Sequence, residues 1–100
     1  MIDEGKLTNE LNKCFRRAHR FDYPAFHHRR QGRFYAAMSY YRQALLAAID
    51  GLRISEVLKD DIAIRACADL IAYLADGMQQ AAEGLRNEGS IDQSNYVGVT

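Results

Sequence analysis

The segment from Phe34 to Asp50 most constrains the fold, because its apolar residues recur at intervals of three and four. The recurring positions are Phe34, Ala37, Met38, Tyr41, Ala44, Leu45, Ala48 and, just beyond, Leu52. This spacing is that of one face of an α-helix. Further apolar residues lie off that face, namely Tyr35, Tyr40, Leu46 and Ala47. Only a narrow polar strip remains, so the helix either lies at the centre of its bundle or shares a surface with a partner. We favour the central position.

The N-terminal third predicts two helices separated by a proline. Thr8 is a favourable N-cap residue for the first helix, which we expect to end near Phe21. This limit follows from Pro24, because the residue before a proline is displaced from the helical region. Pro24 suits the first position of a new helix. We therefore expect a short second helix from Pro24 to Gln31, with Gly32 as its left-handed C-terminal residue.

The last helix is expected to begin near Asp60 and Asp61 and to continue to about Arg86. The two carboxylates suit the positive end of a helix dipole, which explains them better than an acid–base pair does. Glycine costs about 1 kcal/mol relative to alanine inside a helix. We therefore expect Gly77 to mark a close contact with another helix.

These elements predict an all-α fold, a small antiparallel bundle of three to four helices. Residues 1–87 are expected to form a single helical domain, and the polar, turn-rich residues 88–100 a flexible C-terminal tail. One hundred residues fit one domain. No run approaches the roughly 18–20 apolar residues of a membrane span, and the acidic, mixed N-terminus does not resemble a signal peptide. Cys14 and Cys67 are isolated, which is typical of reduced cysteines in a cytoplasmic protein.

Charge is spread unevenly along a chain whose formal net charge is zero. Residues 13–33 contain seven lysines and arginines but the single acid Asp22, while the rest of the chain contains six basic and twelve acidic residues. Aromatic residues lie among these arginines. Arginine binds carboxylates and phosphates, and aromatic rings stack on bases, so an acidic protein and a nucleic acid are both candidate partners. The isoelectric point near 6.8 favours a protein. A third alternative is that the aromatic residues belong to the core and the arginines pair with acids of the same fold or of a second copy of the chain.

The segment Gln31 to Leu45 resembles the inter-helix turn and second helix of a tetratricopeptide repeat. The residues that fit that pattern in register are Gly32, Phe34, Ala37, Tyr41, Ala44 and Leu45. The same pattern is similar to a helix of the microtubule-interacting and trafficking (MIT) domain, a three-helix bundle, and residues 71–74 (Ile-Ala-Tyr-Leu) resemble a step in its following helix. Both families bind peptides or helices in grooves between helices, and neither is catalytic. The resemblance therefore implies a binding module.

Two constellations point toward other chemistry. His27 and His28, together with His19, could suggest a metal site, but adjacent histidines on a helix point about 100° apart and no carboxylate or cysteine completes a ligand set. Arg20 and His27 have the spacing of the arginine–histidine pair of HEPN-type ribonucleases, but the break expected at Pro24 separates them. We therefore expect no catalytic residues, no cofactor and no metal.

The sequence thus favours a noncatalytic protein–protein interaction module, such as an adaptor, a chaperone-like protein or a small inhibitor. Arginine and tyrosine dominate binding hot spots. The expected partner-binding residues are Arg16, Arg17, Arg20, Arg29, Arg30, Arg33, Tyr35 and Tyr40. The partner is expected to present an acidic surface, no membrane is implied, and a homodimer is left open. The alternatives are a nucleic-acid-binding protein that uses the same face and, less favoured, a HEPN-like ribonuclease.

Overall fold

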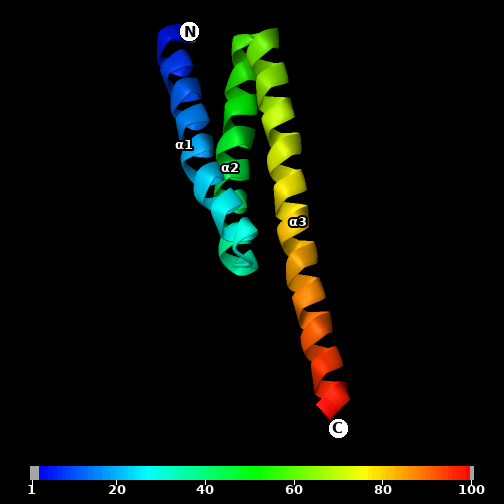
Figure 1. Ribbon diagram of the computed structural model, residues 1–100. Helices are drawn as coiled ribbons and strands as arrows, with labels where there is room; N and C mark the ends of the chain where they lie inside the picture. Colours follow the sequence, from blue (N-terminus) through cyan, green and yellow to red (C-terminus); the bar gives the residue numbers. More distant parts are fainter. Residues whose placement is uncertain (1–2, 100) are drawn as a thin grey trace.

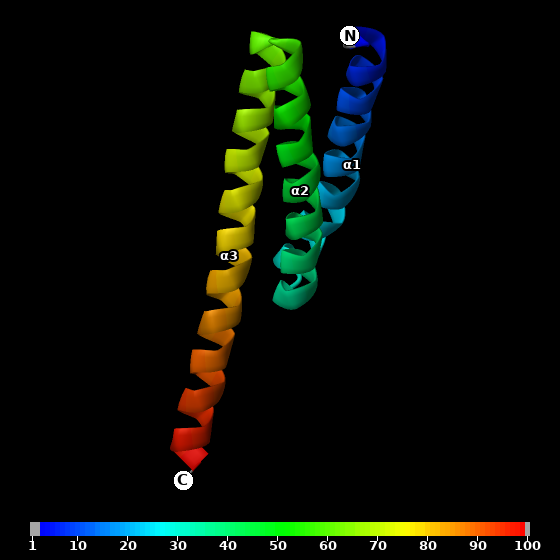
Figure 2. The ribbon, with the colours of Figure 1, turned by 180° about the vertical axis from the view of Figure 1, so that it is seen from behind.

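The computed structural model describes residues 3–99, with side chains described as far as Glu88. It contains three helices, α1 (Glu4–Arg30), α2 (Phe34–Leu58) and α3 (Asp61–Val99), and no strand within the described range. The chain reverses at each of two short turns, and α2 lies between α1 and α3 (Figures 1 and 2). The all-helical prediction is confirmed. None of the helices between residues 3 and 99 is long and apolar enough to cross a membrane.

Helix α1 begins one turn earlier than the sequence suggested. Asp3 is the N-cap, and its Oδ1 accepts a hydrogen bond of 3.1 Å from the backbone N–H of Lys6. Thr8 lies inside the helix, where its hydroxyl donates to the carbonyl of Glu4 at 2.8 Å. The prediction of a Thr8 cap is therefore wrong, because Asp3 supplies an acceptor for the free N–H groups one turn upstream.

Pro24 lies in the interior of α1, so the prediction of two separate helices is wrong. A proline inside a helix removes one hydrogen bond and costs about 3 kcal/mol. Here the residues on both sides are held by packing. Ala25 is completely buried in the main core, and Phe21 packs against the same core. A break at Pro24 would separate these contacts, so the continuous helix is kept despite the lost bond.

The turn between α1 and α2 follows the prediction for Gly32. The backbone N–H of Arg33 donates to the carbonyl of His28 at 2.8 Å, and that of Gly32 donates to Arg29 at 3.1 Å. Gly32 has φ of 78°. This hydrogen-bond pair with a left-handed glycine is the Schellman ending of a helix, so the predicted left-handed residue is confirmed.

The turn between α2 and α3 uses a lysine where the first turn uses glycine. Lys59 is left-handed, with φ of 55°, and the backbone N–H of Asp60 donates to the carbonyl of Ser55 at 3.1 Å. Oδ1 of Asp60 then accepts from the backbone N–H of Ala63 at 3.1 Å. The predicted capping role of Asp60 is thereby confirmed.

Helix α2 is the centre of the fold, as its broad apolar surface predicted. It packs along both neighbours, whereas α1 and α3 scarcely contact each other. The main core joins all three helices and consists of Ala25 from α1, Tyr41, Ala37, Ala44 and Ala48 from α2, and Leu74 and Ala81 from α3. A second, smaller core contains Leu11, Ala63 and Cys67. Cys14 and Cys67 are both buried and unpaired.

Gly77 allows α3 to approach α2 closely. A Cβ atom at this position would lie 2.6 Å from two ring carbons of Tyr41 and 2.8 Å from its hydroxyl oxygen. Gly84, two turns further along α3, faces the ring of Phe34 in the same way. The close contact expected at Gly77 is therefore confirmed, and Tyr41 fills the space that the missing side chain leaves.

Helix α3 is longer than predicted. It continues past Arg86 to Val99 and projects beyond the turn that joins α1 to α2 (Figure 1). The flexible tail expected for residues 88–100 falls on a segment whose side chains, after Glu88, lie outside the described part. That expectation stays a prediction.

Candidate functional site

The outward face of α1 carries a row of four exposed cations, which we call the cationic stripe. Their positions follow the i, i+3, i+4, i+7 spacing of a single helix face, away from the side on which Leu11, Cys14 and Ala18 are buried. Together they line a shallow hollow of about 300 Å³. The stripe consists of Lys13, Arg16, Arg17 and Arg20.

The arginines of the stripe are free of carboxylate partners within the described residues. Lys13 contacts Glu10, with 3.6 Å between Nζ and Oε1, in an exposed pair of little energetic weight. Among residues 3–88, no carboxylate lies within 4 Å of Arg16, Arg17 or Arg20. The alternative in which arginines pair with acids of the same fold is therefore not supported for these three, and their charge faces solvent.

Arg29 has a structural position that differs from that of the stripe. Its Nε donates to the hydroxyl of the buried Tyr41 at 3.1 Å, and its Nη1 donates to Oε1 of Gln80 at 2.7 Å. Nε2 of Gln80 in turn donates to Asp76 at 2.7 Å. We call this set of hydrogen bonds the three-helix joint, because it connects α1, α2 and α3. Arg29 is thus used inside the fold, and the expected role in partner binding would compete with these bonds.

The two remaining predicted arginines lie at the end of α1 and in the turn that follows it. Arg30 is exposed, with its guanidinium 5.7 Å from the centre of the Phe26 ring. Arg33 lies in the first turn, where it donates to Nδ1 of His28 at 2.8 Å and to the side chain of Gln31.

The two predicted tyrosine anchors differ in exposure. Tyr35 is 76% exposed on α2. Tyr40 is half-buried and stacks on His28, with ring centres 5.3 Å apart and an angle of 7° between the ring planes. Of the two tyrosines, Tyr35 is therefore the more exposed candidate anchor.

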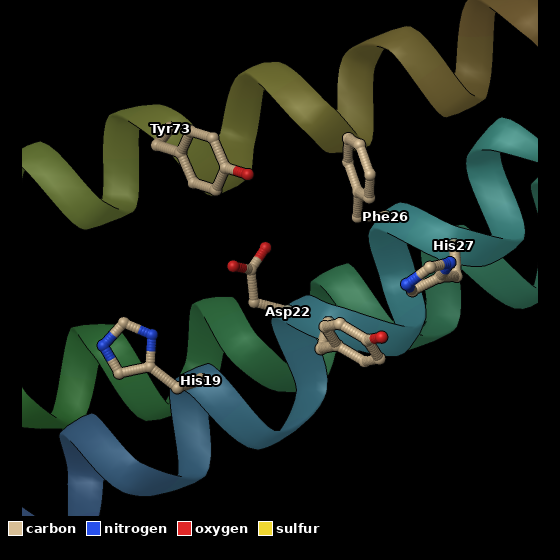
Figure 3. A pocket seen from close by; sticks show the side chains of 6 residues that line it. His19, Asp22, Phe26, His27 and Tyr73 are labelled. Atoms are coloured by element: carbon tan, nitrogen blue, oxygen red, sulfur yellow. The ribbon is translucent and has the colours of Figure 1, made fainter.

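A groove between α1 and α3 lies next to the cationic stripe, and sequence reasoning did not find it. It has a volume of about 430 Å³. We call it the α1–α3 groove, and Figure 3 shows its two walls, one from each helix. It exists because both helices pack on α2 but scarcely on each other. Its lining residues are His19, Asp22, Tyr23, Phe26, His27 and Tyr73.

Asp22 is the polar centre of this groove. Its Oδ1 is buried and has no hydrogen-bond partner among the described residues. Burial raises the pKa of the carboxyl above its ordinary value, and nearby His19 opposes the shift. Burial, followed by the charge of Asp22, likewise raises the pKa of Tyr73. In Figure 3 the carboxyl group of Asp22 extends from α1 into the space between the helices, toward the α3 wall that carries Tyr73.

The groove could not be assembled from the sequence because the expected break at Pro24 placed His19 and Phe26 on different helices. The one available signal was Asp22, the single acid in a basic segment. The continuous helix also removes the separation of Arg20 and His27, so a break at Pro24 no longer counts against a HEPN-type pair. Arg20 lines the hollow of the stripe while His27 lines the groove.

The three histidines do not assemble a metal site. Within residues 3–88, no group of three histidine, cysteine or acidic side chains is placed to hold a metal ion. His27 instead makes edge-on contacts with the rings of Tyr23 and Phe26. No family model, curated protein or solved structure matches the chain, so the resemblance of residues 31–45 to tetratricopeptide and MIT helices stays a prediction.

Proposed function

We propose that this chain is a noncatalytic protein-binding module, an antiparallel three-helix bundle whose cationic stripe docks on an acidic protein surface. The observation that carries this proposal is the set of three guanidinium groups, Arg16, Arg17 and Arg20, which face solvent without carboxylate partners among the described residues. Charges arranged on a rigid helix accelerate the encounter with a complementary surface and orient the partner. Tyr35, exposed on α2, is a further candidate anchor.

A protein partner fits the stripe better than a nucleic acid does. Single-stranded nucleic acids bind where aromatic rings next to cations stack on successive bases. Phe15 and Phe21, which flank the stripe along α1, pack against the two cores instead. The exposed rings nearest to the stripe, Tyr23, Phe26 and Tyr73, line the neighbouring α1–α3 groove around Asp22, whose carboxylate would repel a phosphate backbone.

The test replaces the three arginines together, as Arg16→Gln/Arg17→Gln/Arg20→Gln, and measures binding of fluorescent poly-L-glutamate by anisotropy at low and moderate salt. The matched control is Arg42→Gln/Arg53→Gln/Arg65→Gln, which removes three exposed arginines of α2 and α3. Exposed contacts are worth about 0.5 kcal/mol each, so the stripe variant should bind roughly tenfold more weakly. The control should change the affinity by less than about threefold.

Equal losses in both variants would mean that net charge alone attracts the polyanion, and the stripe would not be a site. A single-stranded RNA of about 20 nucleotides, long enough to span one binding groove, is measured in parallel to separate the alternatives. If the RNA binds at least about tenfold more tightly than polyglutamate and loses that binding only in the stripe variant, the nucleic-acid function replaces the protein-binding one.

A further inference from the structure

We propose that the α1–α3 groove binds a basic side chain, lysine or arginine, of the partner protein, with Asp22 as its counter-charge. The identity of the ligand as a protein side chain rests on the proposed function. The groove itself is a separate site, formed by different residues from those of the stripe. The partner would then present acidic groups to the stripe and a basic group to the groove beside it.

The unpaired acceptor is the first reason. A buried oxygen without a hydrogen bond costs about 1–3 kcal/mol, and Oδ1 of Asp22 is such an atom. Because this oxygen is covered in the described conformation, a donor that enters the groove recovers part of this cost by drawing the carboxyl group round toward itself. An ammonium or guanidinium group fits best, because hydrogen bonds between ionised partners are about twice as strong as neutral ones. The same charge would disfavour a carboxylate or phosphate in the groove.

The aromatic walls are the second reason. Tyr23, Phe26 and Tyr73 line the groove with rings that are 70%, 37% and 53% exposed. Cations bind favourably over such rings. The Phe26 ring already has this type of neighbour, since the guanidinium of Arg29 lies 5.4 Å from its centre. These rings would also pack against the methylene groups of a long basic side chain.

The charges on the opposite wall are the third reason. Asp69 and Asp76 lie four residues before and three residues after Tyr73, so all three share one face of α3. Both aspartates are exposed, and Asp76 accepts a hydrogen bond from Gln80. The positive groups beside the groove are Arg29 and Arg30 and, from the neighbouring stripe, Arg20. On the α3 side of the groove, carboxylates therefore flank Tyr73 on the same helix face.

The test is an NMR titration of the ¹⁵N-labelled protein with small probes that isolate the charge. The probes are N-acetyl-arginine methylamide, N-acetyl-lysine methylamide and the uncharged N-acetyl-norleucine methylamide. The cationic probes should produce saturable shifts in residues 19–27 and 70–76, with dissociation constants in the millimolar range because a single small group gains little binding energy. The norleucine probe should bind at least about fivefold more weakly.

The substitution Asp22→Asn keeps the size of the side chain and removes its charge, and it should weaken binding of the cationic probes at least about fivefold. Asp50→Asn, which neutralises an acid of α2 outside the groove, is the matched control and should leave that binding unchanged. Tyr73→Leu provides a second variant, with an expected loss of about twofold or more, in case the Asp22→Asn substitution alters the local structure. Circular dichroism confirms that each variant is folded.

Equal binding of the three probes, or an Asp22→Asn variant that binds as the parent does, would overturn the groove proposal. The Arg16→Gln/Arg17→Gln/Arg20→Gln protein separates the two proposals, because it should retain the groove probes while losing polyglutamate. Loss of the cationic probes in that variant would show that they do not bind in the groove as a separate site.

Discussion

The contact between Gly77 and Tyr41 predicts that the substitution Gly77→Ala destabilises the protein, although alanine is the better helix former. Propensity alone would favour alanine by about 1 kcal/mol. The added Cβ atom would however lie 2.6 Å from two carbons of the Tyr41 ring, about 1 Å inside ordinary van der Waals separation. Tyr41 is 1% exposed and bonded to Arg29, so it has little room to move.

Overpacking of this kind costs about 1–3 kcal/mol. After the gain in propensity of about 1 kcal/mol is subtracted, the net loss should be up to about 2 kcal/mol, which for a domain of this size lowers the melting temperature by up to roughly 15 °C. Thermal unfolding followed by circular dichroism measures it. Gly5→Ala is the control, since its Cβ meets one atom of Asp3 at an ordinary 3.5 Å and should leave stability unchanged or raised.

A double-mutant cycle tests the cause. Replacing Tyr41 with leucine removes the ring that the new methyl group meets, so Gly77→Ala should cost at least about 1 kcal/mol less in the Tyr41→Leu background. If Gly77→Ala raises the melting temperature as Gly5→Ala does, α2 and α3 do not approach each other as described.

Three further predictions concern the turns, the helix interior and the groove. Lys59→Gly should raise the free energy of unfolding by about 1 kcal/mol in urea titrations, since a side chain is strained at φ of 55°; an unchanged midpoint would contradict a left-handed residue there. Pro24→Ala restores a donor inside α1 and should stabilise by about 1–2 kcal/mol in the same assay, whereas a loss would indicate that the ring itself is needed for packing. The pKa of Asp22 is raised, so the folded protein binds the carboxyl proton of Asp22 more tightly than the unfolded chain does. Protonation of Asp22 therefore stabilises the fold fully below the ordinary pKa of 3.8, and this stabilisation is lost as the pH rises through the pKa of the folded state. Asp22→Asn should therefore abolish this decline and increase stability at neutral pH by no more than about 1 kcal/mol, because solvent screens a side chain that is only partly buried; an unchanged pH profile would contradict the shift.

The sequence predicted an element correctly where the local pattern and the packing of the helices require the same type of residue at the same position. The apolar residues of 34–52 cover more than one helix face, and α2 does pack on two neighbours. Gly32 and Gly77 are the residues that a left-handed turn and a close helix contact need. In each case the physical requirement acts within a few residues, so it is visible in the sequence.

At Pro24 the local sequence preference predicted the wrong structure. A local preference of about 3 kcal/mol against proline in a helix was overridden by packing of Ala25 and Phe21 against residues far away in the sequence. The α1–α3 groove was missed for the same reason, because its walls meet only after both helices have docked on α2.

The arginines predicted from the sequence to bind a partner lie in two different environments in the structure. Arg16, Arg17 and Arg20 face solvent, while Arg29 is used within the fold. No local pattern distinguishes these two outcomes, because the partners of Arg29 come from α2 and α3.

The three-helix joint has a consequence for how the protein assembles. The hydroxyl of Tyr41 and the amide of Gln80 meet the same guanidinium group from two different helices. A hairpin of only two helices, α1 with α2 or α2 with α3, therefore leaves some of these hydrogen-bonding groups without their partners at a partly dehydrated surface. Half-assembled pairs are penalised relative to the complete molecule, so the three helices should form and melt together as one cooperative unit.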